Sequence, residues 1–266
     1  MNSPLLLDVQ DGIATLTLNR PGQGNAIDLD LAKALLQAAI ACDQDGAVRC
    51  VVLTGSGKLF SAGGDLEAFV AAGDGISGFL SELAGTLHLA ISRLMRMDKP
   101  LVVLVNGAAA GAGMSLALIG DIVLAPRTAS FTPAYGAIGL SPDGGLSWLL
   151  PRLVGLRRAQ EITLLNQRVS ATQAEHLGLI TRVVDDGQLE AEGRTVAQTL
   201  AAMHRPALGR IRQLLLASHG SALEAQLEQE ARSIAGLASA PYVREKVAAF
   251  VAQRTPKNNN KESTHG

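Results

Sequence analysis

The chain has 266 residues, of which 47% are hydrophobic, and this is enough to fill the core of one large domain. Its 23 basic and 24 acidic residues give a formal net charge of -1, which provides no overall electrostatic attraction to nucleic acid or to an anionic membrane. Aromatic residues make up only 3% of the chain, so surfaces for stacking bases are scarce. We therefore expect neither nucleic acid nor a membrane as a partner.

Cysteine usage and the N-terminal residues indicate the compartment. Cys42 and Cys50 have neither metal-ligand nor redox spacing. No basic-then-apolar leader precedes Asp8, and polar residues interrupt the apolar stretches before they reach membrane-spanning length. These features predict a soluble cytoplasmic protein without a bound metal.

Hydrophobic periodicity alternates between the strand and helix patterns along the first two thirds of the chain. It predicts strands over residues 13–18, 48–54, 101–105, 121–125 and 180–184, and helices over 29–42, 76–97, 113–118, 146–150 and 171–177. Pro151 should interrupt or restart the helix that begins at residue 146. From residue 189 almost to residue 253 the pattern is helical. This alternation predicts an α/β fold.

Two glycine-containing segments lie where a strand should be followed by a helix. Residues 107–115 (GAAAGAGMS) follow an apolar run and can present backbone N–H groups. Residues 139–145 (GLSPDGG) place one carboxylate, Asp143, at the start of a helix. Oriented N–H donors and a carboxylate suit chemistry in which a carbonyl becomes an enolate and a proton moves.

Each segment also has a purely structural interpretation. Gly111 and Gly113 would equally permit close helix packing, and Asp143 would equally cap the helix that follows it. Taken alone, the glycines do not decide between packing and chemistry, and capping is the commoner role of such an aspartate.

Five motifs occur in a fixed order: FSAGGDL at 60–66, NGAAAGAG at 106–113, GDIVLA at 120–125, the 139–145 segment, and LPRLVG at 150–155. In this order they resemble the crotonase (enoyl-CoA hydratase/isomerase) family. The resemblance implies the α/β ClpP/crotonase-like fold of repeated ββα units, with a core over 1–195 and a helical C-terminal trimerisation region over 196–254. Residues 255–266, rich in asparagine and lysine, are expected to form a flexible tail. The resemblance also implies an acyl-CoA substrate, no cofactor beyond the CoA moiety, and a homotrimer or a hexamer made of two trimers.

The resemblance also assigns roles around the thioester. The backbone N–H groups of Ala62 and Ala112 would hold its oxygen, and Asp143 would be the single acid/base. The positions of the two glutamates that hydratases of the family use are occupied here by Ser115 and Tyr135. Neither side chain is an unassisted base near neutral pH, so efficient hydration is not expected.

Further residues are expected to border the CoA or the acyl group: Arg20, Asn25, Ala26, Gly63, Gly64, Asp65, Leu66, Gly111, Gly113, Ser115, Tyr135, Trp148, Phe250 and Arg254. Among these, Tyr135 and Trp148 would form walls for a bulky acyl group, and Phe250 and Arg254 would close the site of an adjoining subunit. Asp121 is expected to cap or pair locally. His88 lies in a helical pattern from which it can face the pocket, although packing or solvation is the commoner fate of such a histidine.

The segment 142–145 followed by Trp148 is similar to the epoxyphenylacetyl-CoA isomerases of phenylacetate breakdown, and Δ3,Δ2-enoyl-CoA isomerases use related one-base chemistry. The sequence therefore favours an isomerase of unsaturated or epoxidised acyl-CoA esters. Three alternatives remain open. They are a hydratase-like enzyme, a dehalogenase or hydrolase in which Asp143 attacks an aryl-CoA, and a noncatalytic member that binds acyl-CoA or RNA.

Overall fold

A computed structural model of the chain describes residues 3–254. The chain divides into two compact units, the first ending at Arg212 and the second beginning at Gln213. The first unit therefore extends beyond residue 195, the core boundary expected from sequence. Part of the reason is Arg212, a buried residue that donates to the carbonyl of Lys99 at 2.6 Å and pairs with Asp121 at 2.6 Å. The expected tail at 255–266 lies outside the described residues.

Six strands form the central sheet of the first unit, in the order β1-β2-β3-β4-β6-β9. Their bounds are β1 Leu5–Gln10, β2 Ile13–Leu18, β3 Cys50–Gly55, β4 Leu101–Leu104, β6 Ile122–Pro126 and β9 Arg182–Val184. The β1–β2 hairpin is antiparallel, and the other neighbouring strands are parallel. All four residues of β4 are buried, as expected for a parallel strand covered on both faces.

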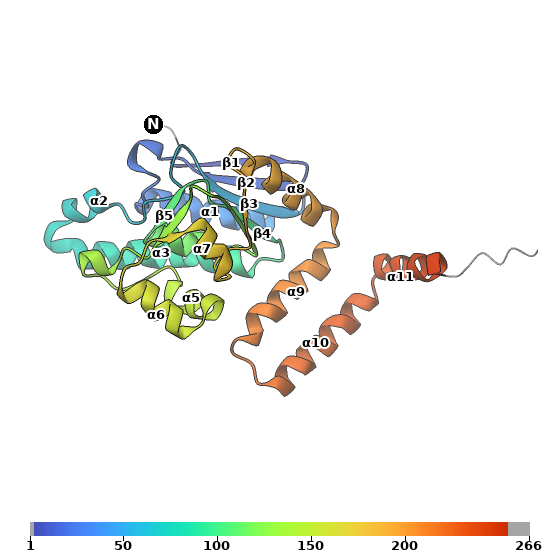
Figure 1. Cartoon of the computed structure of the whole chain (residues 1–266). Coiled ribbons are helices and arrows are strands. Elements are labelled where there is room, and N and C mark those ends of the chain that lie inside the picture. Colours follow the sequence, from blue (N-terminus) through green and yellow to red (C-terminus); the bar gives the residue numbers. More distant parts are fainter. Residues whose placement is uncertain (1–2, 255–266) are drawn as a thin grey trace, which may run out of the picture. The chain divides into compact units, whose positions relative to one another are not determined.

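Helices cover both faces of this sheet (Figure 1). On one face, α1 (Leu29–Gln44) packs against α3 (Ile76–Arg96), and both contribute leucines to the main core. On the other face, α8 (Leu189–Ala202) packs Ala197 and Ala201 against Cys50 and Val52 of β3. Small residues on α8 allow this helix to approach the sheet closely.

A second sheet holds three short strands, β5 (Ala108–Ala110), β7 (Ser130–Thr132) and β8 (Val169–Ser170), in that order. Ser61 adds an isolated parallel bridge to Ala109 of β5. In two successive segments of the chain, one strand therefore lies in the central sheet and the next in the second sheet before a helix begins. These are β4–β5–α4, with α4 at Ala112–Ala117, and β6–β7–α5, with α5 at Leu146–Val154. The expected repeated ββα units are confirmed.

Several short elements were not predicted from the sequence: strands β1, β5, β7 and β8, helix α2 (Leu66–Ala71), helix α6 (Leu156–Leu164), and the 3-10 turns at Pro21–Gln23, Gly73–Gly75 and Gly136–Ile138. The helix α7 (Ala171–His176) agrees with its expectation. The expectation for Pro151 was wrong, because α5 continues through this proline to Val154. Burial of Leu146, Leu149 and Leu150 on one face holds α5 in place despite the lost N–H.

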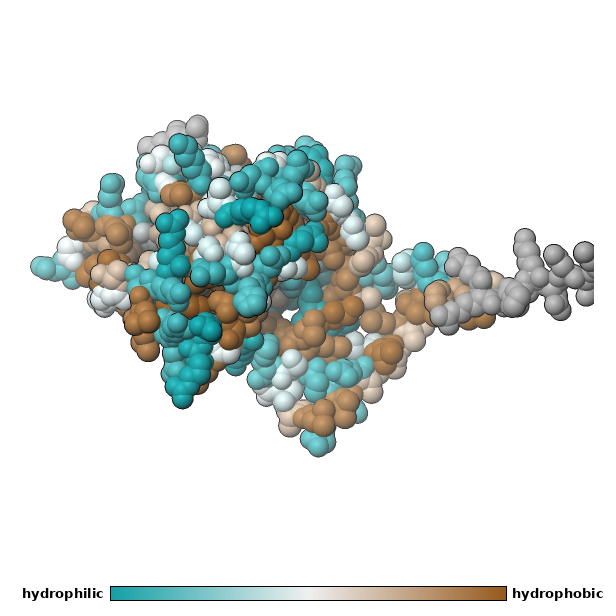
Figure 2. Space-filling view, viewed as in Figure 1, coloured by the Kyte–Doolittle hydropathy of each residue, from teal (hydrophilic) through white to brown (hydrophobic). Residues whose placement is uncertain are grey.

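The C-terminal third is helical, as the periodicity predicted. It contains α9 (Arg205–Ser218), α10 (Leu223–Ala238) and α11 (Pro241–Arg254). Hydrophobic side chains lie exposed on α10 and α11 (Figure 2): Leu223, Leu227, Ile234, Val247 and Phe250. Of the helices in residues 3–254, none is both long and apolar enough to cross a bilayer.

Candidate active site

A cavity of about 390 Å³ lies where the second strands of the ββα units end. Three short segments border it directly after the second sheet, namely Ala62 and Gly64 after the Ser61 bridge, Gly111 and Ala112 after β5, and Ala134 and Tyr135 after β7. The carboxyl ends of parallel strands meet at one edge of a sheet, and ligand sites form there. The rest of the lining is mainly apolar and includes Ile27, Leu66, Phe69, Leu80, Leu83, Leu87, Ile138 and Leu140.

Asp143 lines this cavity and is hydrogen-bonded to Tyr135. The Tyr135 hydroxyl donates to Asp143 Oδ1 at 2.6 Å. Ser115 Oγ lies 3.0 Å from the Tyr135 hydroxyl oxygen and 3.0 Å from the Asp143 carbonyl oxygen, to which it can donate. Burial, together with the charge of Asp143, raises the pKa of Tyr135, so its hydroxyl remains a donor. The two residues at the glutamate positions thus bind the carboxylate residue directly.

His88 reaches the same turn from α3. The backbone N–H of Gly144 donates to His88 Nε2 at 3.0 Å, and this nitrogen lies 3.9 Å from Asp143 Oδ2. Gly144 has a φ of +60°, and a Cβ there would lie 2.7 Å from the Cβ of Ser115. The turn that carries Asp143 therefore requires glycine at this position.

Ala112 supplies the expected backbone donor. It is the first residue of α4, so its N–H lies outside the intrahelical bonds, and no acceptor for it occurs in the described part of the chain. Gly63 faces this N–H, because a Cβ on Gly63 would lie 3.4 Å from the Ala112 nitrogen and 2.7 Å from the Ala110 oxygen. Glycine at residue 63 leaves this space open for a ligand oxygen.

The Ala62 N–H was expected to be a second free donor, and in the structure it is not free. It donates to the Gly24 carbonyl oxygen at 2.9 Å. Asn25 holds Gly24 in this position, because its fully buried side chain accepts from the Arg20 N–H and donates to carbonyls of the 56–60 loop. Ala62 borders the cavity with a bonded N–H, whereas the N–H groups of Ala112 and of Gly64, which also lines the cavity, have no acceptor among the described residues.

The residues expected to bind CoA near the N-terminus are hydrogen-bonded within their own loop, and their role toward CoA remains a proposal. Arg20 pairs with Asp28 at 3.0 Å and with Asp65 at 2.9 Å, and it donates to the carbonyl of Ala26, a buried residue. Asp65 caps α2 by accepting the N–H groups of its first turn. Burial acts to raise the pKa of Asp65, but the N–H of Ala68 and the Arg20 guanidinium outweigh it and hold the pKa below its usual value.

The remaining expected residues are divided between the cavity and other regions. Leu66 lines the cavity, whereas Trp148 is not among its lining residues, so the expected wall role of Trp148 remains a proposal. Trp148 lies on the face of α5 opposite its buried leucines, with the Arg152 guanidinium carbon 4.1 Å from its ring centroid. Gly113 has the packing role, because a Cβ there would lie 2.5 Å from the Ser61 oxygen.

Phe250 and Arg254 belong to the second unit, so their predicted role remains a proposal. The side chain of Arg254 lies outside the described part of the chain. Asp121 pairs locally, as expected, by accepting the Leu101 N–H at 2.6 Å in addition to its ion pair with Arg212. Residues 3–254 contain no group of three or more histidine, cysteine, aspartate or glutamate side chains that could hold a metal ion.

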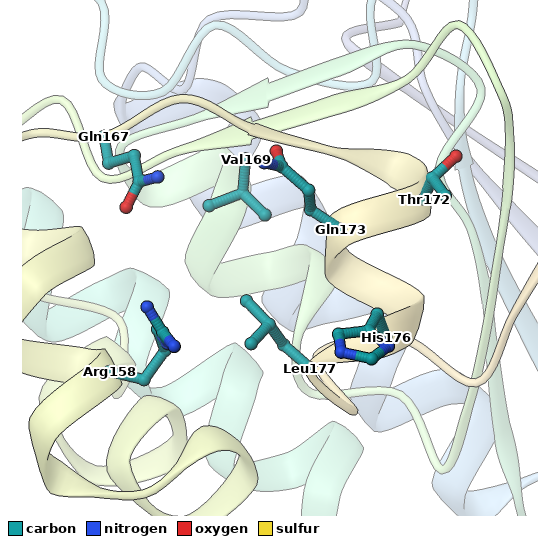
Figure 3. Close-up of a pocket in the computed structure, with 7 residues that line it drawn as sticks. All are labelled: Arg158, Gln167, Val169, Thr172, Gln173, His176 and Leu177. Atoms are coloured by element: carbon teal, nitrogen blue, oxygen red, sulfur yellow. The ribbon is translucent and has the colours of Figure 1, made fainter.

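A second cavity of about 420 Å³ lies beside β8, α6 and α7 (Figure 3). Its lining consists of Arg158, Gln167, Val169, Thr172, Gln173, His176 and Leu177. Two of these polar side chains are used locally, since Arg158 pairs with Glu161 and Gln173 completes the capping box of α7. No carboxylate is present in the lining that Figure 3 shows, so this cavity offers no acid/base. We place the candidate active site in the cavity where Asp143 and the Ala112 N–H lie together.

The position of His88 beside the cavity agrees with its helix spacing. Ala84 and Leu87 of α3 line the cavity, and His88 follows Ala84 by four residues, so it lies on the same helix face. This spacing was present in the sequence. The contact with Gly144 was not, because it depends on how the 139–145 segment folds.

Comparison with known proteins identifies the family of the chain. Residues 8–261 match the model of the enoyl-CoA hydratase/isomerase family. The chain is 39% identical to the 1,2-epoxyphenylacetyl-CoA isomerase of Escherichia coli K12, over 95% of this chain and 97% of that protein. It is 32% identical to 4-chlorobenzoyl coenzyme A dehalogenase-2 of Arthrobacter sp, over 90% and 87% of the two chains. The crystal structure of an enoyl-CoA hydratase from Polaromonas sp. JS666 aligns with a TM-score of 0.90 and 33% identity, covering 95% of this chain and 98% of the other. The chain has the crotonase fold and belongs to the enoyl-CoA hydratase/isomerase family.

Proposed function

We propose that this enzyme isomerises an unsaturated or epoxidised acyl-CoA thioester by proton transfer through Asp143. The observation that carries the proposal is the composition of the cavity. Asp143 is the only acidic side chain among the described residues that line it, and the unpaired N–H of Ala112 borders the same space. A single carboxylate beside an oxyanion donor is sufficient for moving a proton along an enolate.

In this mechanism the Asp143 carboxylate removes a proton from C2 of a 3-enoyl-CoA. The C–H electron pair enters the conjugated system, and negative charge develops on the thioester oxygen, which the Ala112 N–H stabilises. Asp143 then returns the proton at C4, the C3–C4 double bond moves to C2–C3, and no atom is gained or lost. With an epoxide, the same enolate electrons open the C–O bond, and the proton is available to the released oxygen.

The two glutamate positions support isomerisation over hydration. Ser115 and Tyr135 occupy them, and both side chains are hydrogen-bonded to Asp143 or to its backbone. Hydration by the family's two-glutamate chemistry needs a second carboxylate to activate water, and none lines the described cavity. The similarity to an epoxyphenylacetyl-CoA isomerase points the same way.

The test is turnover of defined CoA esters by the purified protein. We expect conversion of 3-enoyl-CoA to 2-enoyl-CoA, or of 1,2-epoxyphenylacetyl-CoA to its isomer, and loss of that conversion in Asp143→Asn. Hydration of 2-enoyl-CoA at a comparable rate would contradict the proposal. Binding of both esters without conversion would instead identify a noncatalytic member of the family.

A second candidate is hydrolytic attack by Asp143 on an aryl-CoA. The observation that favours it is His88, whose Nε2 lies 3.9 Å from Asp143 Oδ2; once Nε2 releases the Gly144 N–H, the imidazole can activate water against an aryl ester of the aspartate. The similarity to a protein named 4-chlorobenzoyl coenzyme A dehalogenase, an enzyme of a chloroaryl-CoA, also supports this candidate. Halide release from a chloroaryl-CoA, with a trapped covalent intermediate, would identify this function.

We further propose that the protein is a cytoplasmic homotrimer or a pair of trimers, with Phe250 and Arg254 near an adjoining subunit's site. Exposed apolar side chains on α10 support association of subunits. Leu223, Leu227 and Ile234 lie on one side of this helix, where contact with another subunit would bury them. Light scattering coupled to size exclusion should give the mass of three or six chains. A monomer at micromolar concentration would overturn this assignment.

A further inference from the structure

Burial and local hydrogen bonds fix the position of the Tyr135 side chain. The Tyr135 side chain is buried, and Ser115, behind it, is completely buried. Ala134, immediately before Tyr135, has a φ of +64°, and its N–H is held by Asn166 Oδ1 at 2.7 Å. A non-glycine residue in this conformation is strained and persists where its surroundings fix it. The position of the Tyr135 hydroxyl is therefore defined by the fold rather than by a flexible loop.

The two oxygens of the Asp143 carboxylate have different surroundings. Oδ1 accepts the Tyr135 hydroxyl at 2.6 Å, a short charge-assisted hydrogen bond. Oδ2 accepts no hydrogen bond from any residue between 3 and 254, because the nearby His88 Nε2 uses its lone pair to accept the Gly144 N–H. Oδ1 thus accepts a hydrogen bond, whereas Oδ2 accepts none from the described residues.

We propose that Tyr135 is a positioning residue for Asp143. The tyrosine fixes Oδ1, and Oδ2 alone takes and returns the substrate proton. This inference rests on the proposed isomerase function and deepens it. A hydrogen bond from a phenol reduces the electron density available on Oδ1 and fixes the plane of the carboxylate. Oδ2 is left as the more basic oxygen of the pair.

The proposal predicts the fate of the proton. If one fixed oxygen serves both C2 and C4 in a mainly apolar cavity, the proton removed from C2 remains on Oδ2 and is returned at C4 before it exchanges with solvent. A 3-enoyl-CoA carrying deuterium at C2 should therefore give a product with deuterium at C4 in ordinary water. A carboxylate free to rotate would expose the proton to water and lose the label.

The experiment compares wild type, Tyr135→Phe and the matched control Tyr242→Phe, which removes the same hydroxyl from α11 in the second unit. We expect kcat of Tyr135→Phe to fall about 10- to 100-fold, the size expected for losing a hydrogen bond to a charged group, with KM changed less than twofold. Label transfer to C4, measured by NMR or mass spectrometry, should fall with it. Tyr242→Phe should match wild type in both readouts.

The outcomes separate this inference from the function on which it rests. Absence of isomerase turnover in wild type would overturn the proposed function. Turnover in wild type without transfer of deuterium to C4 would overturn the one-oxygen path while leaving the function intact, and this readout needs no variant to fold. Equal label transfer in wild type and Tyr135→Phe, with or without a lower rate, would show that the tyrosine is merely structural.

Discussion

His88 Nε2 lies 3.9 Å from Asp143 Oδ2, yet its lone pair accepts the N–H of Gly144. The imidazole therefore holds the backbone beside the carboxylate instead of donating to it. In an isomerase, an acceptor of similar reach should suffice at this position. We expect His88→Gln to retain most of the wild-type kcat and His88→Ala to lose about 10-fold, because an unsupported backbone N–H costs about one to two kcal/mol.

The same pair of variants discriminates the two candidate functions. Hydrolysis of an aryl ester on Asp143 needs a base, and an amide side chain cannot act as one. If His88→Gln abolishes turnover as completely as His88→Ala, the histidine acts as a base and the hydrolytic candidate is favoured. Steady-state rates on 3-enoyl-CoA and on chloroaryl-CoA provide the comparison.

Tyr135 should remain protonated in native protein at a pH where an exposed tyrosine ionises. Burial and the charge of Asp143 raise its pKa, so the neutral form contributes stability that is present below the unfolded value of about 10 and is lost as pH rises above it. The chain has 2 tyrosines, so Tyr242→Phe isolates Tyr135 for spectrophotometric titration. Tyrosinate absorbance should appear only on unfolding. Reversible ionisation near pH 10 in folded protein would contradict the buried hydrogen-bonded hydroxyl.

Gly63 should be required for activity beyond its effect on stability. It has a φ of +97°, and a Cβ there would lie 2.7 Å from the Ala110 oxygen and 3.4 Å from the Ala112 nitrogen. Gly63→Ala is expected to lower kcat about 100-fold by obstructing the oxyanion donor. The matched control is Gly187→Ala, where φ is +82° and nothing lies within 4 Å of the added Cβ. This control should cost about 1–2 kcal/mol of stability at full activity.

Thermal unfolding and turnover of both glycine variants separate the two effects. If Gly187→Ala lowers kcat as much as Gly63→Ala, the effect comes from general destabilisation and not from the donor.

Both cysteines should be unreactive in the folded protein. Burial raises the pKa of Cys50 to about 12, with the charge of Asp121 acting in the same direction, and burial also raises the pKa of Cys42. Because the thiolate is the reactive form, a disulfide reagent at pH 8 should label neither thiol in native protein and both after unfolding in denaturant. Since the pKa values are raised, the associated stability should decline as pH rises above about 8.5. Rapid labelling of one thiol in native protein would show that the core around β3 opens.

The long elements could be predicted from the sequence because their periodicity is a local signal, and helix α3 follows from its apolar period. The role of Asp143 has no such local signal: it is implied by the family resemblance and remains a proposal. Strand β5 was not predicted, since three alanines carry no strand pattern and its pairing with β7 is a tertiary contact. Interactions between distant residues account for the other differences. The Ala62 N–H is bound by Gly24, Trp148 lies outside the cavity, and Arg20 is paired with Asp28 and Asp65.

In the proposed reaction Asp143 moves the α-proton of a bound thioester. The decisive measurement is the rate at which wild type and Asp143→Asn remove deuterium from C2 of a labelled 3-enoyl-CoA, followed by NMR. The asparagine has nearly the same shape and can still accept the Tyr135 hydroxyl through its carbonyl oxygen, so affinity for the CoA ester should be retained. We predict loss of the C2 label in wild type and a rate lower by at least about 100-fold in the variant. Loss of the C2 label at the wild-type rate in Asp143→Asn, with the ester bound equally well, would show that another group moves the proton.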